Sequence, residues 1–353
     1  MIARSALILN TGMLTAIGLS AAQTASSARA GIARFAESSF FAKNGEPMTL
    51  ALVPEDALAP VEELLDAEAT WNNRAQRLLA LAVPALHEVF AGVEQPQSIP
   101  LFLGLPDELA AQGAEFLASL AQVAEFEFDR AHSAAICAGR AAGLLALERA
   151  LEFLASGRGP FAVVGGVDSY FDLDVLNALD AEDRLAGEGV LDGFIPGEGA
   201  CFLLLGAPDA PLSTADTAPM LISALGQGSE SGHRYSQEPH RGDGLATAFA
   251  QLFGCAGAGH TPVPTVYAGY NGENFWAKEW GVAYLRHKDK FAESFAFEHP
   301  VDCFGDPGAA LGPLLIGLAA LGMAKGYRSG PCLVWCGSDR DARAAALITS
   351  RAR

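Results

Sequence analysis

Short apolar runs alternate along this chain with longer segments of helical periodicity. Apolar runs of four to six residues bounded by turn residues predict buried strands, and apolar positions three and four residues apart predict amphipathic helices. Strands are expected at residues 6–9, 99–104, 133–138, 161–166, 201–205, 220–224, 265–268, 332–335 and 344–348. Helices are expected from near Ser20 and at residues 75–90, 108–120, 141–156, 244–253, 275–286 and 308–325.

This alternation predicts an α/β protein whose sheets are covered by helices on both faces. Two of the helices, residues 141–156 and 308–325, are unusually apolar, and each follows a strand and a glycine-containing turn. We therefore expect two similar halves that share these helices as a layer buried between two sheets. A polar, proline-containing stretch at 206–218 predicts the join, which gives an N-terminal half of residues 1–210 and a C-terminal half of residues 211–353.

Composition narrows the possible partners and the compartment. Half of the 353 residues are hydrophobic, which excludes a disordered chain, and the formal net charge is −18. Neither nucleic acid nor an anionic membrane is expected as a partner, because such an acidic surface repels both. The six cysteines lie mostly in apolar surroundings of a chain long enough to fold without disulfides, which predicts a reducing, cytoplasmic compartment and no metal site.

Two uncharged stretches resemble export or membrane segments at first sight. The first, between Arg4 and Arg29, is broken by Asn-Thr-Gly at 10–12, so a strand, a turn and a helix explain it better. The second, between Asp306 and Lys325, contains two prolines and four glycines, which favours a buried helix over a membrane span.

A series of landmarks in fixed order resembles the β-ketoacyl synthases of the thiolase superfamily. They are Ser156-Gly157 after a helix, Val-Val-Gly-Gly at 163–166, Arg184-Leu185, Asp-Gly-Phe at 192–194, Gly-Glu-Gly-Ala at 197–200 and an apolar run at 202–205. The N-terminus, with Thr11-Gly12 after an apolar strand, and the glycine-rich turn at 304–312 are similar to that family as well. The resemblance implies a thiolase-like fold in which two βαβαβ-containing halves pack in layers, α-β-α-β-α.

The residues that this resemblance implies for catalysis are missing. Such synthases use a Cys at a helix N-terminus to carry the acyl group, two His to hold the thioester oxygen, and a Lys that supports one His. Here Arg140, Gly269, Asp306 and Val301 stand at the Cys, His, His and Lys positions. A guanidinium stays protonated and cannot attack an acyl group, and a carboxylate repels an enolate. We therefore expect no catalysis of the family's kind, and no cofactor.

Arg140 and Asp306 should lie at facing turns of the two halves, and we hypothesise that they form a buried ion pair that fills the old site. Three other residues are weaker candidates for chemistry: Cys137, expected on a strand before the helix, and Cys303 and His299 near the glycine-rich turn. Glu198 is expected to satisfy backbone amides, and His233 and His240 to be exposed in a polar loop.

The function favoured by these observations is that of a pseudoenzyme that acts by binding, as a partner subunit or adaptor. The resemblance implies two-fold dimers made through a strand next to the central helix, which we expect at 161–166. The partner could be a second copy of this chain or a synthase-like protein, as for chain-length factors. A secretion-related partner is a further alternative, since degenerate synthase-like proteins accompany type VI secretion genes.

Two alternatives remain open. One is an acyltransferase or 3-oxoacyl synthase-like enzyme with an altered active site, which is the activity expected if any persists. The other is an acyl- or small-molecule-binding protein. Acyl carrier proteins are acidic, so a chain of net charge −18 is a poor electrostatic match for one, and we do not expect it as a partner.

Overall fold

The computed structural model describes residues 4–61, 64–65, 71–125, 127–210, 220–255 and 258–350, and ten strands of this part form one mixed sheet. The strands of this sheet are β1 (Ala6–Thr15), β4 (Leu101–Leu105), β5 (Ala134–Cys137), β6 (Phe161–Ser169), β7 (Glu198–Gly206), β8 (Met220–Ser229), β9 (Val263–Ala268), β10 (Phe291–Glu298), β11 (Cys332–Gly337) and β12 (Ala342–Ser350). Their order is β10-β9-β11-β12-β8-β1-β7-β6-β4-β5.

The sheet consists of two matching halves. Reading outward from the middle, β1-β7-β6-β4-β5 on one side corresponds to β8-β12-β11-β9-β10 on the other. The halves join where β1 and β8 pair antiparallel, with Ala6 opposite Ile222 and Ile8 opposite Met220. The predicted boundary at 210/211 adjoins residues 211–219, which lie outside the described residues, so the division into two domains stays a prediction.

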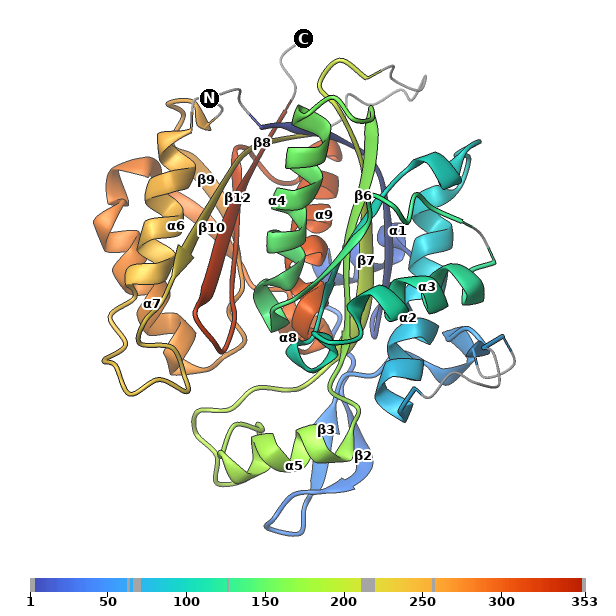
Figure 1. Ribbon diagram of the computed structural model, residues 1–353. Coiled ribbons are helices and arrows are strands. Elements are labelled where there is room, and N and C mark those ends of the chain that lie inside the picture. The colour runs from blue at the N-terminus through green and yellow to red at the C-terminus, as the bar shows by residue number, and fades with distance from the viewer. Residues whose placement is uncertain are drawn as a thin grey trace.

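Helices form three layers around the two halves of the sheet (Figure 1). The described helices are α1 (Ala21–Arg29), α2 (Asn73–Phe90), α3 (Gly113–Val123), α4 (Ala142–Ala155), α5 (Leu173–Ala181), α6 (Asp243–Gly254), α7 (Asn274–Arg286), α8 (Val301–Phe304) and α9 (Leu311–Ala324). Helices α2 and α3 cover the outer face of the first half, α6 and α7 cover that of the second, and α4 and α9 lie between the halves (Figure 1). This arrangement has the predicted layer order α-β-α-β-α, but the two expected sheets are halves of one sheet, because β1 pairs with β8.

The central layer is held together by close packing of small residues. Helix α9 is apolar all around, and Leu311–Ala320 are buried. A side chain at Gly143 of α4 would meet the Pro313 ring of α9, with its Cβ 2.3 Å from the ring's Cδ. Glycine is therefore needed where the two helices touch. None of the described helices is both long and apolar enough to cross a membrane.

The first strand is longer than its sequence pattern indicates. The Asn-Thr-Gly at 10–12 predicted a turn, but β1 continues through it to Thr15. The Asn10 side chain donates to the carbonyls of Glu88 and Val89 on α2. A Cβ at Gly12 would lie 2.0 Å from the Ala85 carbonyl oxygen. These residues therefore let a helix approach the strand closely, and they do not turn the chain.

Several elements were not predicted individually. Strand β10, at one end of the sheet, carries polar residues between its phenylalanines and so lacks a continuous apolar run. Strands β2 (Ala36–Phe41) and β3 (Pro47–Leu50) form a separate hairpin, which projects with α5 from the main body at the bottom of Figure 1.

The strand at the edge of the first half is β5, and the prediction that β6 pairs across a dimer was wrong. Strand β6 is bonded to β7 on one side and to β4 on the other, so it has no free edge. Strand β5 pairs with β4 alone among the described strands. Any sheet that continues into a partner from this half must therefore do so through β5.

Candidate functional site

The two turns that precede the central helices face each other. Gly139, which has a φ of 52°, ends the connection from β5, and Arg140 lies in the short 3-10 turn before α4. Gly305, with a φ of 70°, follows α8 and places Asp306 just before α9. Both glycines occupy the left-handed region that side chains disfavour. Each half of the molecule thus delivers one charged residue to the same point.

Arg140 and Asp306 form a buried ion pair. The Arg140 Nε lies 2.7 Å from Oδ2 of Asp306, and their side chains are 3% and 0% exposed. Arg140 also donates from Nη2 to the Gly269 carbonyl at 2.8 Å and from Nη1 to the Gly337 carbonyl at 3.2 Å. Its guanidinium lies over the Trp276 ring, 4.6 Å from the centroid. The predicted ion pair is confirmed, and Gly269 joins it.

The Asp306 carboxylate has further donors of its own. Its Oδ1 accepts from the Gly308 backbone N–H at 3.0 Å, and its Oδ2 accepts from the Asn271 side chain at 2.8 Å. Burial raises the pKa of Asp306, and Arg140 acts against that rise. Burial opposes the charge on Arg140, but Asp306 holds the pKa of Arg140 above its ordinary value. The pair can exist as charges only because each group is surrounded by partners.

A larger network of charges continues from this pair and was missed from the sequence. Asn271 donates to Glu273 at 3.1 Å, and Arg184 donates to Glu273 at 2.8 Å and to Asp339 at 2.9 Å. Arg234 lies 2.9 Å from Glu273 and 3.3 Å from Asp339. The sequence pointed to one member of this network, Arg184, because Arg184-Leu185 is one of the motifs that resemble the synthases. Its partners Glu273 and Asp339 lie 89 and 155 residues away in the sequence.

The remaining predicted candidates lie outside this pair. Val301 is the first residue of α8 and packs in the hydrophobic core. Cys137 is half-buried at the end of β5, and burial together with Asp107 and Glu108 raises the pKa of its thiol to about 11. Such a thiol is almost wholly protonated at neutral pH and is a poor nucleophile.

Cys303 and His299 line one cavity at α8, and neither Arg140 nor Asp306 lines it. Burial, with Asp302 nearby, raises the pKa of the Cys303 thiol. His299 is bound by Asp302, whose carboxylate lies 2.7 Å from its Nδ1, and this contact raises the pKa of the imidazole. No hydrogen bond between this Cys and this His is present among the described residues, so they do not form a nucleophile and its base.

Glu198 belongs to a second buried polar cluster. It accepts from the Val53 backbone N–H at 2.8 Å, from the Ser169 hydroxyl at 2.7 Å and from two nitrogens of Arg77 at 2.6 and 2.8 Å. The expected bond to a backbone amide is present, and the ion pair with Arg77 adds to it. Both oxygens of the buried Glu198 carboxylate are bound by the protein, so its role is structural and it is not placed to bind a substrate.

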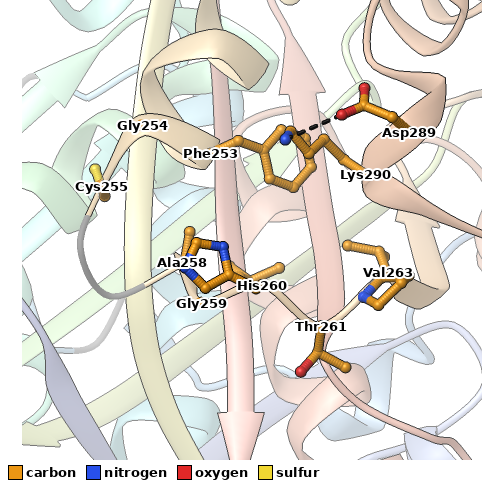
Figure 2. A pocket seen from close by; sticks show the side chains of 12 residues that line it. Phe253, Gly254, Cys255, Ala258, Gly259, His260, Thr261, Val263, Asp289 and Lys290 are labelled. Atoms are coloured by element: carbon orange, nitrogen blue, oxygen red, sulfur yellow. Dashed lines mark ion pairs between the residues drawn. The ribbon is translucent and has the colours of Figure 1, made fainter.

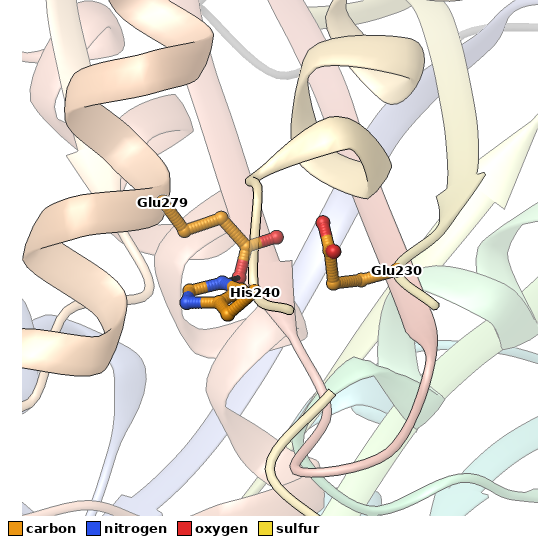
Figure 3. A group of neighbouring side chains, drawn as sticks. All are labelled: Glu230, His240 and Glu279. Carbon is orange, nitrogen blue, oxygen red and sulfur yellow. Dashed lines mark hydrogen bonds and ion pairs between the residues drawn. The ribbon is translucent and has the colours of Figure 1, made fainter. Parts of the chain in front are cut away.

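Glu230, His240 and Glu279 form a group whose geometry would suit a metal ion (Figure 3). The side-chain atoms that would bind a metal already have partners within the protein. Glu279 is bound by Arg343 and by His240, and Glu230 accepts from the Gly244 backbone N–H at the start of α6. Because the Arg343 guanidinium already supplies a positive charge, the group is explained without an ion.

The prediction that His233 and His240 are exposed was wrong. Both are partly buried, and His240 stacks on Phe275 with ring centroids 4.0 Å apart. The polar loop that carries them folds back onto α7, so a hydrophilic local sequence does not reveal their burial.

A cavity of about 340 Å³ lies beside the end of α6 (Figure 2). Phe253, Cys255, His260 and Lys290 are among the residues that line it, and Lys290 is paired with Asp289 at 3.0 Å. It shares no lining residue with the Arg140–Asp306 site.

Comparison with known proteins agrees with this architecture. A ketosynthase from module 6 of the bacillaene synthase of Bacillus subtilis 168 superposes with a TM-score of 0.78 at 13% identity, over 99% of this chain and 72% of that one. A ketosynthase in complex with its chain length factor from Xenorhabdus doucetiae gives 0.77 at 16% identity, over 98% of both chains. This chain has the ketosynthase fold.

The ishigamide ketosynthase/chain length factor is another such structure, with a TM-score of 0.75, 15% identity and coverage of 99% of this chain and 100% of that one. The predicted α/β, thiolase-like fold class is therefore confirmed. No family model and no curated protein matches the sequence. At such identities the ketosynthase likeness establishes the fold, and the activity has to be argued from the site.

Proposed function

We propose that this chain is a non-catalytic ketosynthase-like protein that acts by binding, as a partner subunit or adaptor. The observation that carries the proposal is the buried pair of Arg140 and Asp306 at the turns where the resemblance places a nucleophile and a His. The Arg140 guanidinium lies at this position, held by Asp306, the Gly269 carbonyl and the Trp276 ring. A protonated guanidinium cannot accept an acyl group.

The proposed partner is a second copy of this chain or a synthase-like protein. Solved structures of the same fold include ketosynthases bound to chain length factors, which favours a synthase-like partner over a secretion-related one. Strand β5 offers the matching surface on this chain, because its outer edge pairs with no other described strand. Two such edges would extend the sheet across a two-fold axis.

The absence of acyl transfer is tested by intact mass after incubation with acyl- and malonyl-thioesters. Wild type and Cys137→Ala are compared, because Cys137 lies nearest to Arg140 in the sequence. We expect no adduct on either protein. A stable acyl adduct that disappears in Cys137→Ala would establish the alternative, an acyltransferase with an altered active site.

The dimer proposal is tested by sedimentation of wild type and Ala135→Pro. In the parallel pair β4–β5 the N–H groups alternate, and Ala138 donates to Leu105 of β4, so the N–H of Ala135 points to the free edge. Proline there removes an outward donor, which an edge strand tolerates. We expect the association of wild type, with itself or with a ketosynthase, to be lost in the variant at unchanged melting temperature. Equal association would place the interface elsewhere.

A further inference from the structure

A second cavity, of about 290 Å³, lies between the N-terminal helix α1 and the C-terminal half. Its wall is formed by the end of α1, the end of β10, α8 and the segment that follows α9. It shares no residue with the Arg140–Asp306 pair or with the contacts of that pair. Any ligand bound here would therefore be independent of the role proposed above.

Two guanidinium groups converge on one aromatic ring in this cavity. The Cζ atoms of Arg29 and Arg328 lie 4.5 and 5.6 Å from the centroid of Tyr327. Arg328 is bound to Glu298 at 2.7 Å, yet its Nε has no hydrogen-bond partner. Arg29 is exposed at the end of α1, and no carboxylate of the described residues pairs with it. The Arg29 side chain lines the cavity together with Tyr327 and Arg328.

The charged residues that line this cavity balance one another, whereas the molecule as a whole is strongly acidic. Two arginines balance Glu298 and Asp302, and protonation of His299 makes the wall positive. In contrast, the cavity beside the β2–β3 hairpin has five carboxylates, Glu37, Glu46, Asp180, Asp183 and Glu188, against Lys43. On a chain of net charge −18, a cavity whose lining charges balance repels an anion less than the acidic cavity at the hairpin does.

The rest of the wall is apolar. Ala25 and Ala28 of α1 and Leu318 of α9 face the cavity together with the Phe297 side of β10. We propose that this cavity binds a small organic carboxylate, with the carboxylate between Arg29 and Arg328 and an apolar tail against α1 and α9. Arginine favours carboxylates because its planar fork matches their two oxygens. A dianionic phosphate is less suitable, since Glu298 and Asp302 would repel the second charge.

The test is calorimetric titration of the full chain with hexanoate and benzoate, each compared with its neutral amide. We expect the acids to bind at millimolar concentration and the amides to bind more weakly. Arg29→Gln should weaken hexanoate binding about tenfold and leave hexanamide unchanged, because one charged contact is lost. Glu298→Gln should strengthen hexanoate binding, since it frees Arg328 and removes a repulsive charge.

Arg149→Gln is the matched control, since Arg149 is an exposed arginine on α4 outside the cavity. Binding to this variant should equal that to wild type, and melting curves show whether each variant is folded. Equal affinity for acid and amide, failure of both acids to bind at millimolar concentration, or no response to Glu298→Gln would each overturn the proposal.

Discussion

At the scale of single residues, the site is decided by which charges are buried and what surrounds them. Arg140 and Asp306 would each be unfavourable in the core alone, and each is compensated by the other and by backbone groups. Replacing one partner of such a pair leaves an uncompensated charge, whereas replacing both removes the problem. The pair is consequently worth testing by a mutant cycle.

Arg140→Met should lower the free energy of unfolding by about 3–5 kcal/mol, because Asp306 is left buried without its cation. The double variant Arg140→Met/Asp306→Asn should recover most of that loss, since no charge remains and Asn keeps a side-chain oxygen for Asn271. Urea unfolding of the wild type, both single variants and the double variant measures the coupling. Strictly additive losses would contradict a paired site.

Asp168 should make stability depend on pH. It is buried between Arg74 and the Ala309 N–H of the other half, and burial raises its pKa to about 6. The folded state then holds the proton more tightly than the unfolded chain, so this contribution is present below about pH 4 and is lost as the pH rises through 6. The difference in unfolding free energy between wild type and Asp168→Asn should fall by roughly 3 kcal/mol over that range. A constant difference would contradict the raised pKa.

At the scale of elements, the close packing of a helix against a strand explains why the local sequence pattern did not predict the full length of β1. Strand β1 and helix α2 touch at Gly12, where the backbone of α2 fills the place of a side chain. The local pattern Asn-Thr-Gly predicted a turn, because the contact that requires the glycine is made with Ala85, more than 70 residues away in the sequence. Strand β10 was missed for a related reason, since its polar positions are typical of an edge strand.

Gly12→Ala should lower the unfolding free energy by more than about 3 kcal/mol or abolish folding, because its Cβ would collide with the Ala85 carbonyl. Gly281→Ala is the matched control on α7, where nothing lies within 4 Å of the added atom. It should raise stability by up to about 1 kcal/mol through helix propensity. Thermal melting of the two variants checks both signs, and similar melting temperatures would refute the packing argument.

At the scale of the whole molecule, buried polar contacts tie one half to the other. Arg140, Asp168 and Arg184 belong to the first half, and each bonds to residues of the second. The central helices α4 and α9 add apolar contact along the same plane. Since both kinds of contact cross the join, we expect the two halves to unfold together.

Arg184→Gln should cost about 3 kcal/mol, because Glu273 and Asp339 lose one of the two arginines that they share, and Arg234 alone remains to compensate both carboxylates. It should also broaden the unfolding transition as the halves lose their coupling. Arg286→Gln is the control: its ion pair with Asp243 lies within one half, and both side chains are about half exposed, at 49% and 51%. Calorimetry that shows equal losses for the two variants would rule out a special role for the cross-half network.

Local patterns in the sequence determined most strands and helices, the two similar halves, and the presence of charges at 140 and 306, because periodicity and turn chemistry act over a few residues. Tertiary structure alone decided which strand is the edge, why β1 passes through Gly12, and which residues surround Arg140. Asn271, Glu273 and Asp339 meet Asp306 and Arg184 only after both halves have folded and packed. Contacts of that kind depend on the register and packing of distant segments, which no local pattern contains.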